Sequence, residues 1–100
     1  MALDRNGYAK SIMPTKNGVC FLCGLCTETV RHEVYGGANR EISKANGFWV
    51  NLCPNCHRKV HEVYNRDYVI RKLKKPCELI YQTTHTREQF KKLIGEYYDG

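Results

Sequence analysis

Two pairs of cysteines constrain this 100-residue chain more than any other feature of its sequence. Cys20 and Cys23 form one Cys-x-x-Cys pair, and Cys53 and Cys56 form a second pair beyond an intervening segment, 24–52. Each pair can present two thiolates from one tight turn, so two such turns complete a tetrahedron around Zn²⁺. The spacing therefore predicts a structural zinc site, which would stabilise a domain that has only a small hydrophobic core.

The two remaining cysteines fit this zinc site less well. Cys26 also stands in Cys-x-x-Cys spacing with Cys23, so it is an alternative ligand to Cys20. We favour Cys20, because Gly24 then lies just beyond the turn, where a permissive backbone is needed. Cys77 has no neighbouring cysteine or histidine in the sequence, and we interpret it as a small buried hydrophobic residue.

The composition narrows the classes of partner. The net charge of +6 favours a polyanion such as DNA, because lysine and arginine residues that meet phosphates release counterions; the alternative is a solvated surface that only keeps the chain soluble. No apolar run approaches the ~18 residues of a membrane span, and residues 1–12 lack a signal-peptide core. We therefore expect an intracellular protein without a membrane partner, in which the cysteines bind zinc rather than form disulfides.

Hydrophobic periodicity predicts two short strands in the middle of the chain. The strands are expected at residues 27–35 and 48–52, where apolar and polar side chains alternate. Between them, residues 39–46 predict one or two helical turns, with Asn39 as the N-cap and Gly47 as the stop.

Helices are predicted for the rest of the chain. The first begins at the second cysteine pair and runs to about Tyr64. The next covers residues 67–82, where Pro76 is expected to kink or split it. The last begins at the capping box Thr86-Arg87-Glu88-Gln89. Its apolar stripe consists of Phe90, Leu93, Ile94 and Tyr97.

The predicted organisation is a single α+β domain. Residues 1–19 are expected to form an N-terminal arm, and residues 20–65 a zinc-clamped ββα core. Residues 66–100 are expected to form a helical C-terminal extension that packs on this core.

Three of the four histidines fall within the predicted ββα core. His57 and His61 are four residues apart, so a helix places both imidazoles on one face as a bidentate metal site. His32 alternates with Val30 and Val34 on the strand face that should look toward this helix. The three imidazoles are therefore predicted to converge on one cleft. The alternative is a structural His32, with His57 as a further zinc ligand and His61 on the surface.

Two longer runs surround these histidines. The first is Arg31-His32-Glu33-Val34-Tyr35-Gly36-Gly37-Ala38-Asn39-Arg40, and the second is Leu52-Cys53-Pro54-Asn55-Cys56-His57-Arg58, followed by His61. Together with the first cysteine pair, they resemble the HNH endonucleases, most closely the small HNH proteins of bacteriophages and prophages of Gram-positive bacteria. Weaker flanking likenesses are Asn6-Gly7-Tyr8-Ala9 and Thr86-Arg87-Glu88-Gln89-Phe90.

This resemblance implies a ββα-metal fold with one catalytic divalent cation besides the structural zinc. His32 matches the strand histidine that acts as general base in such enzymes. His57 matches the metal-binding histidine of the motif helix, and His61 lies next to it as a second ligand. The cation would be Mn²⁺, Ni²⁺, Mg²⁺, Co²⁺ or Zn²⁺. Because imidazole suits the transition metals and Mg²⁺ prefers oxygen, we expect higher activity with Mn²⁺ or Ni²⁺ than with Mg²⁺.

The motif asparagine and the residue before the general base need separate assignment. Asn39 best matches the asparagine of the family's name, which orders the loop or touches the metal; the alternatives are Asn46 and Asn51. Many family members have a metal-binding Asp or His just before the base, but this chain has Arg31, which cannot bind a cation. Glu33, Glu28 or a substrate phosphate would then supply the missing ligand.

The function implied by the resemblance is that of a metal-dependent DNA endonuclease of phage or prophage type, which nicks or cuts both strands. Arg40, Arg58 and Lys59 are expected to hold DNA phosphates. Other phage proteins, such as terminase, are the expected partners in phage DNA packaging. The alternative is a non-catalytic zinc-stabilised module that binds DNA or a protein, which would need the cysteines and basic residues but not His32.

Overall fold

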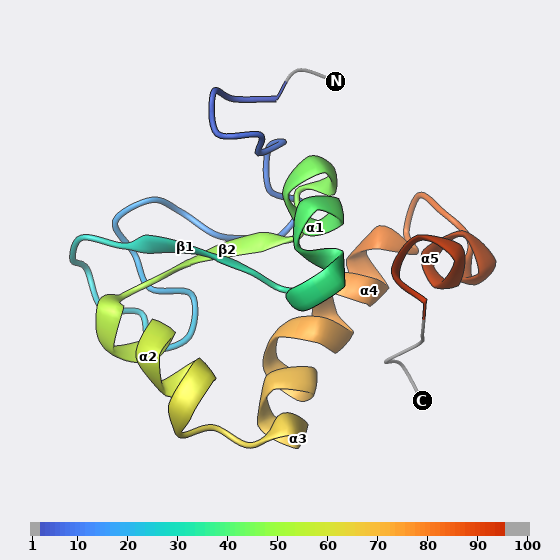
Figure 1. Ribbon diagram of the computed structural model, residues 1–100. Coiled ribbons are helices and arrows are strands. Elements are labelled where there is room, and N and C mark those ends of the chain that lie inside the picture. The colour runs from blue at the N-terminus through green and yellow to red at the C-terminus, as the bar shows by residue number, and fades with distance from the viewer. Residues whose placement is uncertain (1–2, 96–100) are drawn as a thin grey trace.

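A pair of short antiparallel strands lies at the centre of the computed structural model, which describes residues 3–95 (Figure 1). The strands are β1 (Val30–Glu33) and β2 (Trp49–Leu52), and their register places His32 opposite Val50. Because side chains alternate along a strand, His32, Val50 and Leu52 lie on the same face of this sheet. The predicted alternation is confirmed in both strands.

The first strand is shorter than the predicted 27–35 because its two ends bind other partners. At one end, the N–H of Thr27 donates to the carbonyl of Gly18, 2.9 Å away in the N-terminal segment. At the other end, the N–H of Tyr35 donates to the hydroxyl of Ser43 at 3.1 Å. Ladder hydrogen bonds to β2 are thus limited to the middle of the predicted strand.

The connection between the strands is helical, as predicted. A short 3₁₀ turn, η1 (Gly37–Asn39), leads into α1 (Arg40–Asn46), and Gly47 ends this helix in the left-handed conformation. Asn39 occupies the N-cap position, but its side chain makes no capping hydrogen bond. The amide of Asn39 instead donates to the carbonyl of Ile94 at 2.9 Å, which ties this connection to the C-terminal end of the fold.

The helix after the second cysteine pair is α2 (Pro54–Glu62), which ends slightly before the predicted position. Cys53 is its N-cap, and the sulfur of this residue accepts a hydrogen bond from the N–H of Cys56 at 3.3 Å. Pro54 occupies the first turn, where no partner for an N–H is needed. In Figure 1, α2 runs along one side of the sheet, and the start of the N-terminal segment, residues 3–12, lies on the other side.

Pro76 divides the next predicted helix, as expected. The helical stretches are α3 (Arg66–Val69), the π-helical segment η2 (Ile70–Lys74) and α4 (Lys75–Tyr81). A proline ring lacks an N–H and collides with the carbonyl four residues earlier in an α-helix. Here the turn before Pro76 widens, so that the N–H of Lys75 donates to the carbonyl of Ile70, five residues back.

The last helix, α5 (Arg87–Ile94), begins at the predicted capping box. The hydroxyl of Thr86 accepts from the N–H of Gln89 at 3.0 Å, and the Gln89 side chain accepts from the N–H of Thr86 at 2.7 Å. Tyr97 of the predicted apolar stripe lies outside the described residues, as do the end of the predicted extension (66–100) and the start of the predicted arm (1–19).

One hydrophobic core joins the sheet, α2 and the C-terminal helices. Phe48 and Phe90 are fully buried in it, and the ring of Tyr35 lies 5.6 Å from each of theirs in edge-on or steeply inclined contact. The fold is therefore a small α+β domain with a two-stranded antiparallel sheet. Within residues 3–95, no helix is both long and apolar enough to cross a membrane.

The N-terminal segment covers the face of the sheet that α2 leaves open. Arg31 forms an ion pair with Asp4 at 2.7 Å, and its guanidinium lies over the rings of Tyr8 and Trp49. The indole of Trp49 donates to the carbonyl of Ala9 at 2.8 Å. These contacts explain why an arginine stands before His32, because its side chain fastens the N-terminal segment to the sheet.

We expect Gly47→Ala to lower the free energy of unfolding by about 3 kcal/mol. A β-carbon at this position would collide with the carbonyl oxygen of Lys10, and its φ of +75° costs a further ~1 kcal/mol for any L-residue. Gly37→Ala is the matched control, since its φ is +58° and a β-carbon there has nothing within 4 Å. Urea unfolding of both variants measures the difference, and equal losses would contradict the close approach of Lys10.

Candidate functional site

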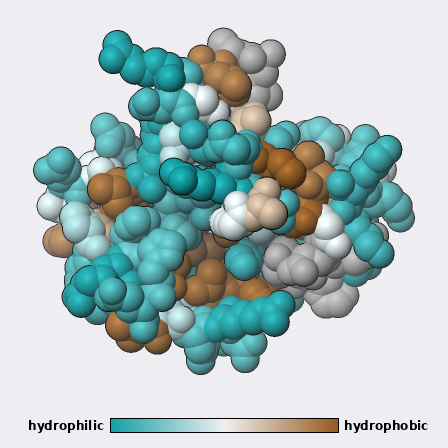
Figure 2. Space-filling view, in the orientation of Figure 1, coloured by the Kyte–Doolittle hydropathy of each residue, from teal (hydrophilic) through white to brown (hydrophobic). Residues whose placement is uncertain are grey.

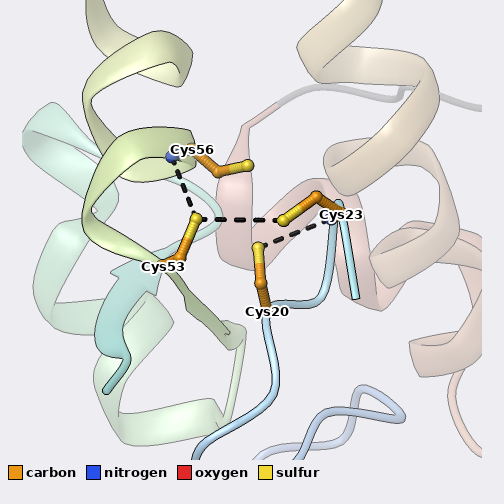
Figure 3. A group of neighbouring side chains, drawn as sticks. All are labelled: Cys20, Cys23, Cys53 and Cys56. Carbon is orange, nitrogen blue, oxygen red and sulfur yellow. Dashed lines mark hydrogen bonds between the residues drawn. The ribbon is translucent and has the colours of Figure 1, made fainter. Parts of the chain in front are cut away.

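Four cysteine sulfurs gather where the N-terminal segment meets the start of α2 (Figure 3). They lie within 4.8 Å of one another and belong to Cys20, Cys23, Cys53 and Cys56. The sulfurs of Cys23 and Cys53 are 3.9 Å apart. A tetrahedral zinc ion with Zn–S bonds of about 2.3 Å separates its sulfur ligands by about 3.8 Å. The cluster is therefore compatible with a structural zinc ion.

Each cysteine pair is shaped by a tight turn with N–H groups directed at sulfur. The N–H of Cys23 donates to the sulfur of Cys20 at 3.5 Å, and the second pair repeats this contact at 3.3 Å. Gly24 has a φ of +77°, and its N–H donates to the carbonyl of Cys20 at 2.9 Å. The predicted need for a permissive residue after the first turn is confirmed.

The pKa values of the thiols move in opposite directions within the cluster. Burial raises the pKa of Cys20, but the hydrogen bonds it accepts, that from the Cys23 N–H foremost, outweigh burial and lower it to about 6. Burial, followed by hydrogen bonds with the neighbouring thiols, raises the pKa of Cys56. Thiolates crowded this closely repel one another, and a divalent cation would relieve that repulsion.

The other two cysteines lie outside this cluster. Cys26 is exposed, and its backbone forms an isolated bridge with Val19. Cys20, rather than Cys26, is thus the residue that the fold brings to the second pair. Cys77 is fully buried in α4, and burial raises the pKa of its thiol to about 12, as expected for a buried cysteine.

A second group of potential metal-ligating atoms lies between β1 and α2. Ring nitrogens of His32, His57 and His61 all lie within 4.8 Å of one another. The ring of His32 lies 5.5 Å from that of His57 and 5.4 Å from that of His61, and the two α2 rings are 4.9 Å apart. The i,i+4 spacing on α2 and the inward position on β1 produce this convergence. In the described part of the chain, no carboxylate belongs to the group.

The fold favours the neutral form of two of these imidazoles, His32 and His57. Burial, followed by the positive charge that His57 and His61 can carry, lowers the pKa of His32 to about 4. Burial and then His61 lower the pKa of His57. Neutral imidazoles have a free lone pair, which a metal ligand and a general base both require.

The three histidines line a cleft of about 570 Å³. Glu33 lies at its edge, where the Tyr8 hydroxyl donates to one carboxylate oxygen at 2.9 Å and Nε of Arg40 donates to the other at 2.7 Å. Burial raises the pKa of Glu33, but these two partners outweigh it and the net pKa is lowered. Glu33 therefore lies in the cleft as an ionised carboxylate with both oxygens engaged, whereas Glu28 is exposed and does not line the cleft.

None of the three candidate asparagines lines the histidine cleft. Asn39 donates to the carbonyl of Ile94, and Asn46 donates to that of Ile42 at 2.9 Å. Asn51 lies on the sheet face opposite His32. Of the two predicted roles of Asn39, loop ordering fits its contact in the fold.

The three predicted phosphate-binding residues occupy different surroundings. Arg40 lines the histidine cleft, where it is paired with Glu33. Arg58 projects from the exposed side of α2, where it contacts Asn55 at 2.9 Å and Glu62 at 4.0 Å. Lys59 follows on the same helix and is half-buried.

Tyr8, Val69 and Lys74 are among the cleft residues that sequence reasoning did not identify. Tyr8 comes from the N-terminal segment, and the other two come from the C-terminal helices. Figure 2 shows hydrophobic side chains between α2 and α3, bordered by hydrophilic ones. The only signal in the sequence was indirect, namely the effect of Pro76 on the helix that carries Val69 and Lys74.

Comparison of the chain with family models, with curated proteins and with solved structures finds no match.

We expect Cys23→Ser to abolish zinc binding and to unfold most of the domain at 37 °C, since a structural zinc site contributes directly to folding. Cys26→Ser is the matched control, because Cys26 is equally exposed and belongs to the same loop. It should keep one zinc ion per chain and an unchanged melting temperature. Elemental analysis and thermal unfolding measure both, and zinc loss in Cys26→Ser would contradict the ligand set.

The burial of His32 makes stability depend on pH. Its pKa is about 4 in the fold against an ordinary 6.5, so the unfolded chain takes up this proton first as the pH falls. The contribution of neutral His32 to the free energy of unfolding is therefore complete above pH 6.5 and is lost as the pH falls to 4. At ~1.4 kcal/mol per pKa unit, the loss is at most about 3 kcal/mol. Urea unfolding of the zinc-loaded protein measures this loss. In His32→Gln the free energy of unfolding should fall less over the same pH interval. Equal losses in the wild type and in His32→Gln would contradict a buried neutral His32.

Proposed function

We propose that this chain is a metal-dependent DNA endonuclease and that β1, β2 and α2 form an HNH-type ββα-metal site. The observation that carries this proposal is the convergence of His32, His57 and His61 in one cleft. A cysteine cluster compatible with zinc lies at the start of the same helix that supplies two of the histidines. The resemblance to the HNH endonucleases supports the roles assigned to each residue.

His32 is the proposed general base. It removes a proton from a water molecule, whose oxygen then attacks the phosphorus of a DNA phosphodiester. Its place in the middle of β1, next to Val50 across the ladder, holds the imidazole rigidly against α2. Its lowered pKa keeps the ring unprotonated at neutral pH, which supports this role.

His57 and His61 are the proposed ligands of a catalytic divalent cation. Two imidazole nitrogens favour Mn²⁺, Ni²⁺, Co²⁺ or Zn²⁺ over Mg²⁺, which prefers oxygen ligands. Such a cation would supply positive charge for the phosphate oxygens and for the departing 3′ oxygen.

The residues that surround the cleft support DNA as the substrate. Arg40 lies in the cleft itself, and Arg58 and Lys59 extend the basic surface along α2. These residues would hold backbone phosphates on either side of the reacting bond. Asn39 is proposed to order the loop before α1 through its bond to the Ile94 carbonyl. Other phage proteins, such as terminase, are proposed partners on the strength of the resemblance alone.

A non-catalytic zinc-stabilised module that binds DNA or a protein is the second candidate. One observation favours this candidate, namely that no carboxylate in the described part of the chain joins the three histidines. The position where many HNH enzymes have an acidic or histidine ligand is occupied by Arg31, whose side chain is paired with Asp4. Such a module would depend on the cysteines and on the basic residues, but it would tolerate the loss of His32.

We expect the purified zinc-loaded protein to nick supercoiled plasmid faster with Mn²⁺ or Ni²⁺ than with Mg²⁺. His32→Ala should lower the rate at least about 100-fold, which is the usual contribution of a general base, without loss of zinc. His85→Ala is the matched control, because His85 is exposed and its ring stacks on Tyr81, outside the cleft. Agarose-gel time courses measure the rates.

Three outcomes of this assay would contradict the proposal or one of its parts. Full nicking activity in His32→Ala would show that His32 is not the general base. Absence of nicking by the wild-type protein with all five cations, together with retained DNA binding, would favour the non-catalytic module. Equal or higher rates with Mg²⁺ would contradict a site made of two imidazole ligands.

A further inference from the structure

We infer that His32, His57 and His61 together bind a zinc ion of their own, with all three imidazoles as ligands. The three ligand atoms, from β1 and α2, lie within 4.8 Å of one another. This inference goes beyond the proposed function, in which His57 and His61 hold the cation and His32 binds none. Only its consequence for DNA cleavage rests on that function.

The spacing of the three rings matches the spacing around one tetrahedral ion. With Zn–N bonds of about 2.0–2.1 Å, the ion lies about 3.2 Å from each ring centre, and the tetrahedral angle then separates two ring centres by about 5.2 Å. The ring centre of His32 lies 5.5 Å from that of His57 and 5.4 Å from that of His61, and the two α2 rings are 4.9 Å apart. All three separations therefore lie close to the tetrahedral value.

An octahedral ion fits only part of this arrangement. Ligands at right angles, with bonds of about 2.1 Å, bring two ring centres to about 4.6 Å. The separation of 4.9 Å between His57 and His61 is close to this value, whereas the two separations that involve His32 are clearly longer. An octahedral cation is therefore held by the two α2 histidines, and a tetrahedral one also takes His32.

The donor set favours zinc over harder cations. Three imidazole nitrogens form the group, and no carboxylate in the described part of the chain joins them. Imidazole is a common zinc ligand, whereas Mg²⁺ and Ca²⁺ prefer oxygen. Zinc with three protein ligands keeps a fourth position for water or another oxygen ligand, and the cleft that the histidines line has room for it.

The burial of the three ligands lets an ion enter the site from solvent. His61 is exposed, His57 is half-buried and His32 is buried, so His32 completes the site from the sheet side. Two cationic side chains that line the same cleft, Arg31 and Arg40, each lie 2.7 Å from a carboxylate, which reduces their repulsion of the ion.

Zinc at this site would block the proposed chemistry of His32. A neutral imidazole has one nitrogen that donates and one that accepts, so a metal bond at the accepting nitrogen leaves no lone pair for a proton of water. Octahedral Mn²⁺ or Ni²⁺, held by His57 and His61, leaves that nitrogen free. We therefore expect zinc, added beyond what the cysteine cluster binds, to inhibit the nicking that Mn²⁺ supports.

Metal binding tests the site without relying on cleavage. The protein is first loaded with one zinc ion per chain and is then titrated with Zn²⁺, followed by calorimetry, and with Co²⁺, followed by visible absorption. Tetrahedral Co²⁺ absorbs far more strongly than octahedral Co²⁺, and bands from sulfur ligands would report exchange into the cysteine cluster. We expect one further ion per chain and a tetrahedral Co²⁺ spectrum without sulfur bands.

His32→Ala should raise the Kd for the second zinc ion at least about 10-fold, since even the loss of a residue behind a metal ligand costs that much. It should also turn the Co²⁺ spectrum octahedral. His85→Ala is the matched control, because His85 is exposed and lies outside the cleft, and it should change neither Kd nor spectrum. Thermal unfolding checks that each variant is folded, and the wild-type spectrum reports the coordination geometry without any variant.

An octahedral spectrum or no second ion in the wild type would overturn the inference, and so would an unchanged Kd in folded His32→Ala. A protein that binds zinc tetrahedrally through His32 but never nicks DNA loses only the proposed nuclease activity. A protein that nicks with Mn²⁺ but keeps His32 off the metal loses only this inference. Nicking that continues with zinc on all three histidines would contradict His32 as the general base.

Discussion

The approach of two cysteine pairs is the constraint on which the rest of this small domain depends. Cys20 and Cys23 come from the N-terminal segment, and Cys53 and Cys56 lie at the start of α2, with the four sulfurs within 4.8 Å of one another. Because Cys53 also caps α2, the same contact sets where this helix begins and how it is rotated. That rotation decides which α2 side chains face the sheet.

The histidine cleft follows from this arrangement and is completed by distant segments. The C-terminal helices pack into the same core as the sheet, through Phe90 and Leu73, and one wall of the cleft comes from them. The start of the N-terminal segment is attached to the opposite face of the sheet by Arg31 and reaches the cleft through Tyr8, whose hydroxyl donates to Glu33. A domain of this size thus uses nearly every element to shape one site.

Much of this fold was predictable from the sequence, because the relevant signals are local. Alternation around His32, the stop at Gly47 and the capping box at Thr86 each depend on residues within a few positions, and the structure has all three. The role of Asn39 was less predictable, since its side chain binds a carbonyl of α5 instead of capping α1. Lys74 was missed because a helical periodicity of 3.6 does not describe a π-helical turn.

The sequence by itself predicted two groups of potential metal ligands, since Cys-x-x-Cys pairs and an i,i+4 histidine pair impose their geometry through short stretches of backbone. Only the tertiary structure decided that Cys20 rather than Cys26 joins the sulfur cluster, and that both oxygens of Glu33 are engaged by neighbours. It also decided that Lys74 enters the cleft. These outcomes depend on contacts between segments far apart in the chain, which pattern and spacing do not encode.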